Sequence, residues 1–227
     1  MQLLLDKLTS YIAPFECLAC GVEGALLCKD CIQLVPQLQP RCYKCHQISD
    51  GATTCKSCRK SSLLDAVWVA TPYEGFAEAL IQQLKFQRAI SAAEIIAYSM
   101  LENFGDQLPD NVIIVPIPTA SSRIRQRGYD QSVMIAKQLA KKTQLPYANI
   151  LTRYGQARQT GKSRHARLRQ LTNAFQVKHH VLPKDTRIIL IDDVLTTGAT
   201  LEAAAKCLHD SGLLRIQGAV FASADHK

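Results

Sequence analysis

The segment 187–200 constrains the fold most strongly, and it reads RIILIDDVLTTGAT. An apolar, mostly β-branched run at 188–191 is followed by two adjacent acids, Asp192 and Asp193, and then by small and hydroxyl-bearing residues. An uninterrupted apolar run is typical of a parallel strand that is buried on both faces. The segment therefore predicts a buried strand, a tight loop and the start of a helix in a parallel α/β sheet.

The loop after this strand is suited to a sugar phosphate. It comprises Thr196, Thr197, Gly198, Ala199 and Thr200. A helix N-terminus that follows small residues presents free backbone N–H groups and the positive end of the helix dipole to an anion, and the threonine hydroxyls add donors. Asp192 and Asp193 stand at the carboxyl end of the strand, where open α/β sheets bind ligands, and they suit a ribose diol or hydrated Mg²⁺. A βα turn without a ligand is the alternative.

Eight of the nine cysteines form four Cys-x-x-Cys pairs in the first 58 residues. The pairs are Cys17 and Cys20, Cys28 and Cys31, Cys42 and Cys45, and Cys55 and Cys58. Such pairs are a strong metal signal, and disulfides are the weaker interpretation for a chain expected in the reducing cytosol. A segment this short cannot bury enough apolar surface to fold without a cross-link such as a metal ion or a disulfide. We therefore predict structural zinc in closed Cys₄ sites.

Sequential pairing of these cysteines, which gives two small zinc ribbons, is the preferred arrangement. Interleaved pairing and a single occupied site remain open. Two loaded sites would add a net charge of −4, so the formal charge of +8 would fall to about +4, with the basic character in the second part of the chain.

Two domains are expected, an N-terminal helix with the zinc ribbons at 1–62 and a parallel α/β domain at 63–227. The alternating pattern predicts strands at 66–71, 112–115, 150–153, 174–177 and 216–222 besides the central one. It predicts helices at 75–86, 90–104, 130–142 and 201–211, helical turns at 164–171, and a short amphipathic helix near the N-terminus. The chain has no apolar run of 18 residues or more, so we expect no membrane span and a cytoplasmic protein.

A second candidate for anion binding follows the strand at 112–115. The segment 116–128 is expected to be a mobile loop that carries Arg123, Arg125 and Arg127 and ends at Gly128. The forked donors of arginines at alternate positions match the charge of a pyrophosphate, so a clamp is predicted. A solvated loop is the alternative.

The central segment is similar to the phosphoribosyl pyrophosphate (PRPP) loop of type I phosphoribosyltransferases. Several motifs together resemble the ComF/GntX family over nearly the whole chain: the cysteine pairs, LKF at 84–86, VPIP at 115–118, RxRxRGYDQ at 123–131, residues 167–175, and IDDVLTTGAT at 191–200. The family usually has RGFNQ, so Tyr129 and Asp130 are departures, as is Gln170. Asp130 puts an acid beside the expected pyrophosphate site and is expected to weaken anion binding unless it pairs with an arginine or Mg²⁺.

The resemblance implies a type I phosphoribosyltransferase fold, with Asp192 and Asp193 on the ribose hydroxyls and the following loop around the 5′-phosphate. The segment 116–128 is then the pyrophosphate loop. It also implies a protein that binds Mg²⁺ with PRPP and acts in natural transformation or in the handling of internalised single-stranded DNA, alongside DNA-uptake or recombination proteins. A nucleobase phosphoribosyltransferase of salvage metabolism and a PRPP-sensing regulator are the alternatives. The acceptor, turnover and oligomeric state are not predicted.

The segment 153–169 carries six basic residues and no acid. They are Arg153, Arg158, Lys162, Arg164, Arg167 and Arg169. Sustained charge of one sign is usually a solvated face. Two functional interpretations compete with it, an anion-binding hood over PRPP and a track for the backbone of single-stranded DNA, with Tyr154 available for stacking.

Overall fold

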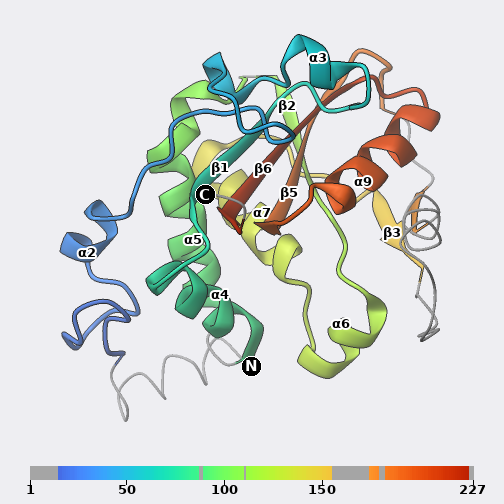
Figure 1. Ribbon diagram of the computed structural model, residues 1–227. Helices are drawn as coiled ribbons and strands as arrows, with labels where there is room; N and C mark the ends of the chain where they lie inside the picture. Colours follow the sequence, from blue (N-terminus) through green and yellow to red (C-terminus); the bar gives the residue numbers. More distant parts are fainter. Residues whose placement is uncertain (1–14, 87–88, 110, 155–173, 179–181, 225–227) are drawn as a thin grey trace, which may run out of the picture.

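A four-stranded parallel sheet forms the centre of the protein, as a computed structural model shows for residues 15–86, 89–109, 111–154, 174–178 and 182–224 (Figure 1). The strand order is β1 (Val67–Pro72), β6 (Arg215–Ser223), β5 (Arg187–Leu195) and β2 (Val112–Pro116). The predicted N-terminal helix, the helical turns at 164–171 and nearly all of the basic segment lie outside the described residues.

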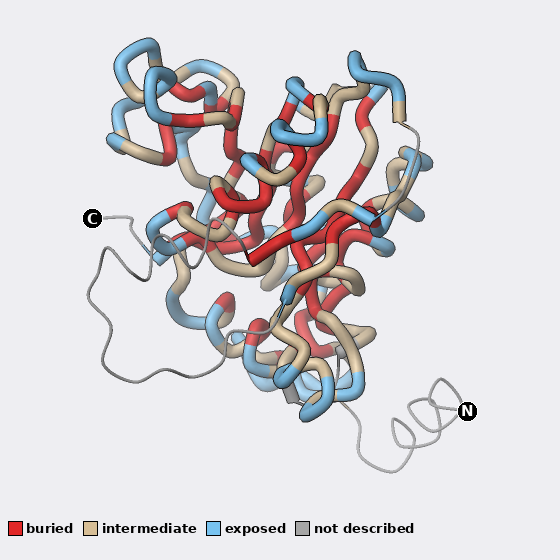
Figure 2. The backbone as a smooth tube through the Cα atoms, turned by 90° about the vertical axis from the view of Figure 1, so that its right-hand side faces the viewer, coloured by how far each residue is buried: buried red, intermediate tan, exposed pale blue. Residues whose placement is uncertain are grey.

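The apolar run predicted to be a buried strand is β5, and it occupies an inner position of the sheet. Its residues 188–191 are at most 1% exposed, between parallel neighbours β2 and β6. Burying each of these Ile and Leu side chains contributes about 1.5–3 kcal/mol, which fixes β5 firmly in this position. Figure 2 shows the buried residues concentrated in the interior of the molecule, with exposed residues at the periphery.

Helices cover both faces of the sheet (Figure 1). On one face, α4 (Phe76–Phe86), α5 (Ala89–Phe104) and α7 (Gln131–Thr143) share a core with inward-facing residues of the sheet such as Ile189 and Phe221. On the other face, α9 (Ala199–Asp210) packs on Ile188, Leu190 and Val220. A two-stranded antiparallel sheet of β3 (Leu151–Arg153) and β4 (Phe175–Val177) lies on the α9 side. The doubly covered parallel sheet confirms the predicted class of fold.

The predicted helices and strands within the described residues agree with the structure to within about two residues at each end. The segment 116–128 is the exception, because it contains the helix α6 (Ser121–Arg127) rather than a continuous loop. No proline or glycine interrupts residues 119–127, and Gly128 ends the helix in a left-handed conformation with φ 82°, donating its N–H to Ile124 O at 2.7 Å.

The cysteine-rich segment contains the short helices α2 (Lys29–Gln33) and α3 (Lys56–Arg59) and the 3₁₀ turn η1 (Asp50–Ala52); a second 3₁₀ turn, η2 (Gly105–Gln107), follows α5. Its side chains Leu26 and Ala52 belong to the same apolar cluster as the sheet. The predicted boundary at residue 62 stays a prediction. Among the described residues, the helices are too short or too polar to cross a membrane.

Candidate functional site

The carboxyl edge of the sheet carries a cavity of about 440 Å³. Six of the residues predicted to bind a ligand line it: Asp192, Asp193, Thr196, Thr200, Arg123 and Arg127. The cavity exists because β2 ends at Pro116, which pairs with Ile191, whereas β5 continues to Leu195. The last residues of β5 therefore have β6 on one side and open space on the other, as expected where open α/β sheets bind ligands.

The two acids are held by short hydrogen bonds at the end of β5. Asp192 Oδ1 accepts from Ser132 Oγ at 3.1 Å and from the Asp193 N–H at 2.9 Å, and Asp193 Oδ1 accepts from the Val194 N–H at 2.9 Å. Burial and the neighbouring Asp193 carboxylate raise the pKa of Asp192 well above its ordinary value. A cation or the hydroxyls of a sugar would stabilise the charged form of this carboxyl group.

In the loop between β5 and α9 two threonines are exposed and the glycine is buried. Thr196 and Thr197 are exposed, and Thr197 Oγ1 accepts from the Ala199 N–H at 3.4 Å. Gly198 is buried, has φ 72° and stands immediately before α9. Thr197, Gly198 and Ala199 were predicted to contact the ligand, but the structure does not place them among the residues that line the cavity. Their backbone forms the turn that carries Thr196 and Thr200 to it.

Two of the three arginines that were predicted to bind a ligand line the cavity, and all three lie on α6. Arg123 and Arg127 are four residues apart, share one face of the helix and line the cavity. Arg125 is exposed and does not line the cavity, because two residues correspond to about half a turn of a helix. Two of the three arginines thus form an i, i+4 pair at the cavity, and a role of Arg125 in ligand binding stays a prediction. Gly128, also predicted to bind, does not line the cavity and ends α6 instead.

Nine further residues line the cavity, and four of them bear on ligand binding although the sequence analysis did not assign them to this site, Arg153 having been considered only as part of the basic segment. The four are Tyr73, Lys85, Gln131 and Arg153. Lys85 lies in LKF and Gln131 in RGYDQ, so polar side chains within the recognised motifs were the available signal. Arg153 comes from β3, and its guanidinium lies 5.4 Å from the ring centre of Phe175. Burial and nearby Arg123 lower the pKa of Arg153, while Asp192 opposes the shift.

Gln131 has a donor available for an anion. It is 2% exposed, its Oε1 accepts from Thr119 Oγ1 at 3.3 Å, and its buried Nε2 has no hydrogen-bond partner among the described residues. A buried donor without a partner costs about 1–3 kcal/mol. A ligand oxygen in the cavity would remove this cost.

Two of the three departures from the family pattern, Asp130 and Tyr129, have structural partners, and the third, Gln170, lies outside the described residues. Asp130 accepts from the Thr119 N–H at 2.8 Å and from Thr119 Oγ1 at 3.1 Å, and burial raises its pKa. These hydrogen bonds come from an uncharged residue, so pairing of Asp130 with an arginine or Mg²⁺ stays a prediction. Tyr129 donates its hydroxyl hydrogen to Leu84 O at 2.9 Å and ties the start of α7 to α4.

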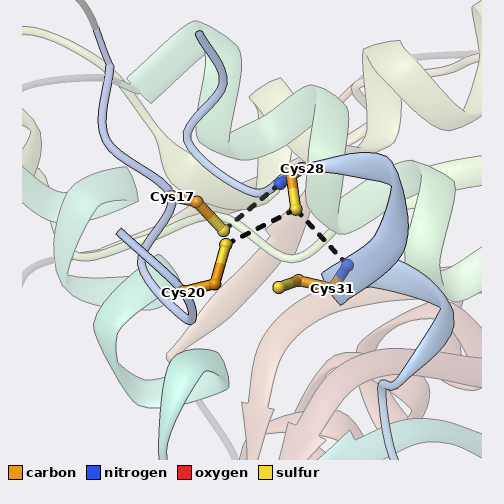
Figure 3. A group of neighbouring side chains, drawn as sticks. All are labelled: Cys17, Cys20, Cys28 and Cys31. Carbon is orange, nitrogen blue, oxygen red and sulfur yellow. Dashed lines mark hydrogen bonds between the residues drawn. The ribbon is translucent and has the colours of Figure 1, made fainter. Parts of the chain in front are cut away.

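The cysteines form two Cys₄ clusters, and the pairing is sequential as preferred. Cys17, Cys20, Cys28 and Cys31 form one cluster (Figure 3), and Cys42, Cys45, Cys55 and Cys58 form the other. Within each cluster all the sulfur atoms lie within 4.8 Å of one another. The Sγ atoms of Cys20 and Cys28 are 3.7 Å apart and those of Cys45 and Cys55 are 3.6 Å apart. Sulfurs about 2.3 Å from a tetrahedral zinc lie about 3.8 Å apart, so both clusters fit zinc.

The two clusters begin with the same backbone turn. Gly21 donates its N–H to Cys17 O, and His46 donates its N–H to Cys42 O, each at 2.8 Å. Both residues have positive φ, 76° and 59°. Such knuckles point backbone N–H groups at sulfur; Cys28, for example, donates its N–H to Cys17 Sγ at 3.4 Å (Figure 3).

The thiol groups show why each cluster needs a cation. Burial opposes ionisation of Cys17, but backbone N–H groups of Cys20 and Cys28 outweigh it and lower its pKa to about 6. The Ser57 hydroxyl and the Cys58 N–H lower the pKa of Cys55 to about 6. The neighbouring sulfurs, Cys28 and Cys55 first, raise the pKa values of Cys31 and Cys58. Ionisation of Cys31 and Cys58 is therefore disfavoured in the metal-free clusters, and the charge of a bound metal ion would favour it.

Comparisons with known proteins agree with this architecture. The family model of the phosphoribosyl transferase domain matches residues 129–227. Competence protein F of Haemophilus influenzae is 29% identical over 220 residues, which cover 89% of this chain and 94% of that protein. DNA utilization protein YhgH of Salmonella typhimurium is 28% identical over 219 residues, covering 90% and 95%. The chain is thus similar over most of its length to proteins of the ComF family.

The match to the phosphoribosyl transferase domain and the parallel sheet confirm the predicted fold, a type I phosphoribosyltransferase domain preceded by a segment with two Cys₄ clusters. Competence protein ComFC of Bacillus subtilis is 28% identical over 179 residues, covering 75% of this chain and 72% of that protein. Among solved structures, orotate phosphoribosyltransferase from Aeropyrum pernix aligns with a TM-score of 0.41 and 16% identity over 66% of this chain and 82% of that chain.

Metal analysis tests the Cys₄ clusters. We expect protein purified under reducing conditions to contain close to two zinc ions per chain. Strong chelators should expose residues 17–58 to proteases while the sheet keeps most of its secondary structure, because the sheet has its own apolar core. Metal-free protein with an N-terminal segment that resists proteolysis would contradict the assignment.

The raised pKa of Asp192 predicts a pH-dependent gain of stability in the Asp192→Asn variant without ligand. A carboxyl group with a pKa raised in the folded state stabilises the fold below its unfolded pKa, and this contribution is lost as the pH rises through the folded pKa. At pH 7 the variant should melt about 2–4 °C higher than the parent, which corresponds to about 1 kcal/mol for a chain of this size. The gain should vanish near pH 4, whereas Asp106→Asn, at an exposed position, should change little at either pH. A lower melting temperature for Asp192→Asn at pH 7 would contradict the electrostatic account.

Proposed function

We propose that this protein binds PRPP with Mg²⁺ in the cavity at the carboxyl edge of the sheet and acts in the uptake or use of DNA. One observation supports PRPP as the ligand. Two carboxylates, two loop threonines, an i, i+4 arginine pair and an unpartnered buried amide donor converge on one cavity of about 440 Å³. Acids and cations in one cavity match a ligand that joins a diol to phosphates.

Each group of the cavity matches one part of PRPP. The start of α9, with Thr196 and Thr200, supplies N–H and hydroxyl donors for the 5′-phosphate. Asp192 and Asp193 accept hydrogen bonds from the ribose hydroxyls. On the opposite side, Arg123, Arg127 and Gln131 suit the pyrophosphate.

Mg²⁺ prefers oxygen ligands and is commonly held by one or two carboxylates together with substrate phosphates. The adjacent carboxylates of Asp192 and Asp193 fit that preference. When bound, the ion supplies positive charge between the acids and the pyrophosphate, and it favours the ionised form of Asp192, whose pKa is raised without it.

Transfer of the phosphoribosyl group to a nitrogen acceptor is the second candidate, favoured by the match to the phosphoribosyl transferase domain. Tyr73 is the one aromatic side chain among the described residues that line the cavity, and its ring is the available surface for stacking a base. Release of pyrophosphate from PRPP that depends on one nucleobase in a panel would establish this activity.

Single-stranded DNA is the proposed macromolecular partner. Two observations support this partner. The relatives are named for competence and for DNA utilization, and the chain has a formal charge of +8. Tyr154, 58% exposed, stands at the start of the basic segment and offers a stacking surface. Basic residues after Tyr154 are proposed to follow the DNA backbone, and they lie outside the described residues.

The arginine pair gives a test with a control on the same helix. Arg123→Gln with Arg127→Gln should weaken Mg²⁺·PRPP binding at least about tenfold in calorimetry, because even one charge-assisted hydrogen bond is worth about 1.5–3 kcal/mol. Arg125→Gln removes the same charge from the opposite face of α6 and should change the affinity less than about twofold. Equal losses in the two variants would assign the effect to net charge and reject the clamp.

The DNA proposal predicts a change in salt dependence. Neutralising Arg158, Lys162, Arg164 and Arg167 should weaken binding of single-stranded DNA and reduce its log–log salt slope by about one unit for each DNA phosphate that the variant no longer neutralises. The affinity for PRPP should change less. A salt slope equal to that of the parent protein would contradict a role of this segment in binding DNA.

A further inference from the structure

The second zinc ribbon touches the phosphate loop directly. Tyr43 lies between the metal ligands Cys42 and Cys45, and its ring packs on Gly198. A Cβ atom at Gly198 would lie 2.8 Å from Tyr43 Cε2 and 3.1 Å from Cδ2, closer than carbon atoms approach without a shift. The ring therefore occupies the space that any other residue at position 198 would need.

Polar contacts attach the same knuckle to the first turn of α9. The Tyr43 hydroxyl lies 2.7 Å from Ser62 Oγ and donates to Glu202 Oε1. Lys44 Nζ lies 3.3 Å from Glu202 Oε1, and the Leu63 N–H donates to Glu202 Oε2 at 3.2 Å. Glu202 in turn donates its backbone N–H to Gly198 O at 2.9 Å. The Glu202 carboxylate thus joins the knuckle, the backbone at Leu63 and the helix whose N-terminus faces the cavity.

The first ribbon is placed differently. Its residues Phe15, Leu18 and Leu26 pack on the apolar cluster that includes α4 and α5. Figure 1 shows α2, in the first ribbon, on the opposite side of the molecule from α9. The chain therefore contains two metal clusters of the same chemistry, of which the second makes the contacts with the phosphate loop described above.

The contact bears on ligand binding because a helix N-terminus binds phosphate through backbone N–H groups, whose directions depend on the loop conformation. Gly198 gives this loop the greatest conformational freedom, and its left-handed conformation is one of several that glycine adopts. A rigid ring against Gly198 restricts these alternatives before the ligand arrives. Such preorganisation raises affinity by lowering the entropy lost on binding.

We propose that the second zinc knuckle sets the conformation of the phosphate loop, so that affinity for a ribose 5′-phosphate depends on metal at Cys42, Cys45, Cys55 and Cys58 and not on metal at the first cluster. Tyr43 and Glu202 are the positioning residues. The inference rests on the proposed function, since it concerns the 5′-phosphate end of the PRPP site. It makes loss of zinc from the second cluster a means of weakening the site.

Matched cysteine variants test the proposal. Cys45→Ser with Cys58→Ser disables the second cluster, and Cys20→Ser with Cys31→Ser disables the first; each protein should retain about one zinc per chain. Ribose 5-phosphate and Mg²⁺·pyrophosphate are the calorimetric probes. The second-cluster variant should bind ribose 5-phosphate at least tenfold more weakly than the parent and pyrophosphate within twofold. The first-cluster variant should bind both within twofold.

Variants of Tyr43 test the contact in protein that keeps both metals. Tyr43→Leu removes the ring and should weaken ribose 5-phosphate binding about tenfold without changing pyrophosphate binding. Tyr43→Phe keeps the ring and should recover most of that affinity. A general loss of stability would affect both probes, so the difference between them separates positioning from a structural role. If the second-cluster variant does not fold, Tyr43→Leu decides the question.

The outcomes of these experiments distinguish failure of the inference from failure of the proposed function on which it rests. Parent protein that binds neither probe would reject the proposed function and the inference together. Parent protein that binds both, with ribose 5-phosphate affinity unchanged in Tyr43→Leu and in the second-cluster variant, would overturn the inference and leave the proposed function in place.

Discussion

Parallel pairing along both sides of β5 determines where the chemistry of this protein can occur. Residues 188–191 are buried between two strands and two layers of helices, so the strand has one register, and that register carries Asp192 and Asp193 past the end of β2. Pro116 and Pro118 turn the neighbouring chain away at that point and lead it into α6. The acids therefore face the arginine pair across open space. The cavity follows from the unequal lengths of two neighbouring strands.

Charges of opposite sign share this cavity without direct neutralisation of the central acid. The hydrogen bonds to Asp192 come from Ser132 and from the backbone, and its pKa is raised by burial and by Asp193. Arg153 is partly desolvated in the same place, and Gln131 holds a buried donor without a partner among the described residues. Each of these features costs stability in the free protein. A ligand with hydroxyls at one end and phosphates at the other would satisfy them together, which is the usual relation between stability and function at a binding site.

Local patterns in the sequence predicted the features that depend on neighbouring residues. The apolar run of β5, the Cys-x-x-Cys pairs and the small residues before α9 each act over a few positions, and the structure contains the strand, the sequential clusters and the helix start. The arginine segment was predicted wrongly because a loop was assumed where residues 121–127 form a helix, and a period of 3.6 pairs Arg123 with Arg127 rather than with Arg125. Long-range contacts had no sequence signal. Arg153 reaches the cavity through the β3–β4 pair, and Tyr43 meets Glu202 across 159 positions.

A calorimetric titration of the unmodified, zinc-loaded protein with PRPP tests the central claim most directly. The arrangement of two carboxylates and an arginine pair around one cavity predicts one PRPP site per chain, with binding at least tenfold tighter in the presence of Mg²⁺ than with a chelator that spares zinc. A factor of ten corresponds to about 1.4 kcal/mol. Ribose 5-phosphate and pyrophosphate should each compete for this site. Absence of saturable PRPP binding in protein with both Cys₄ clusters loaded would contradict the account.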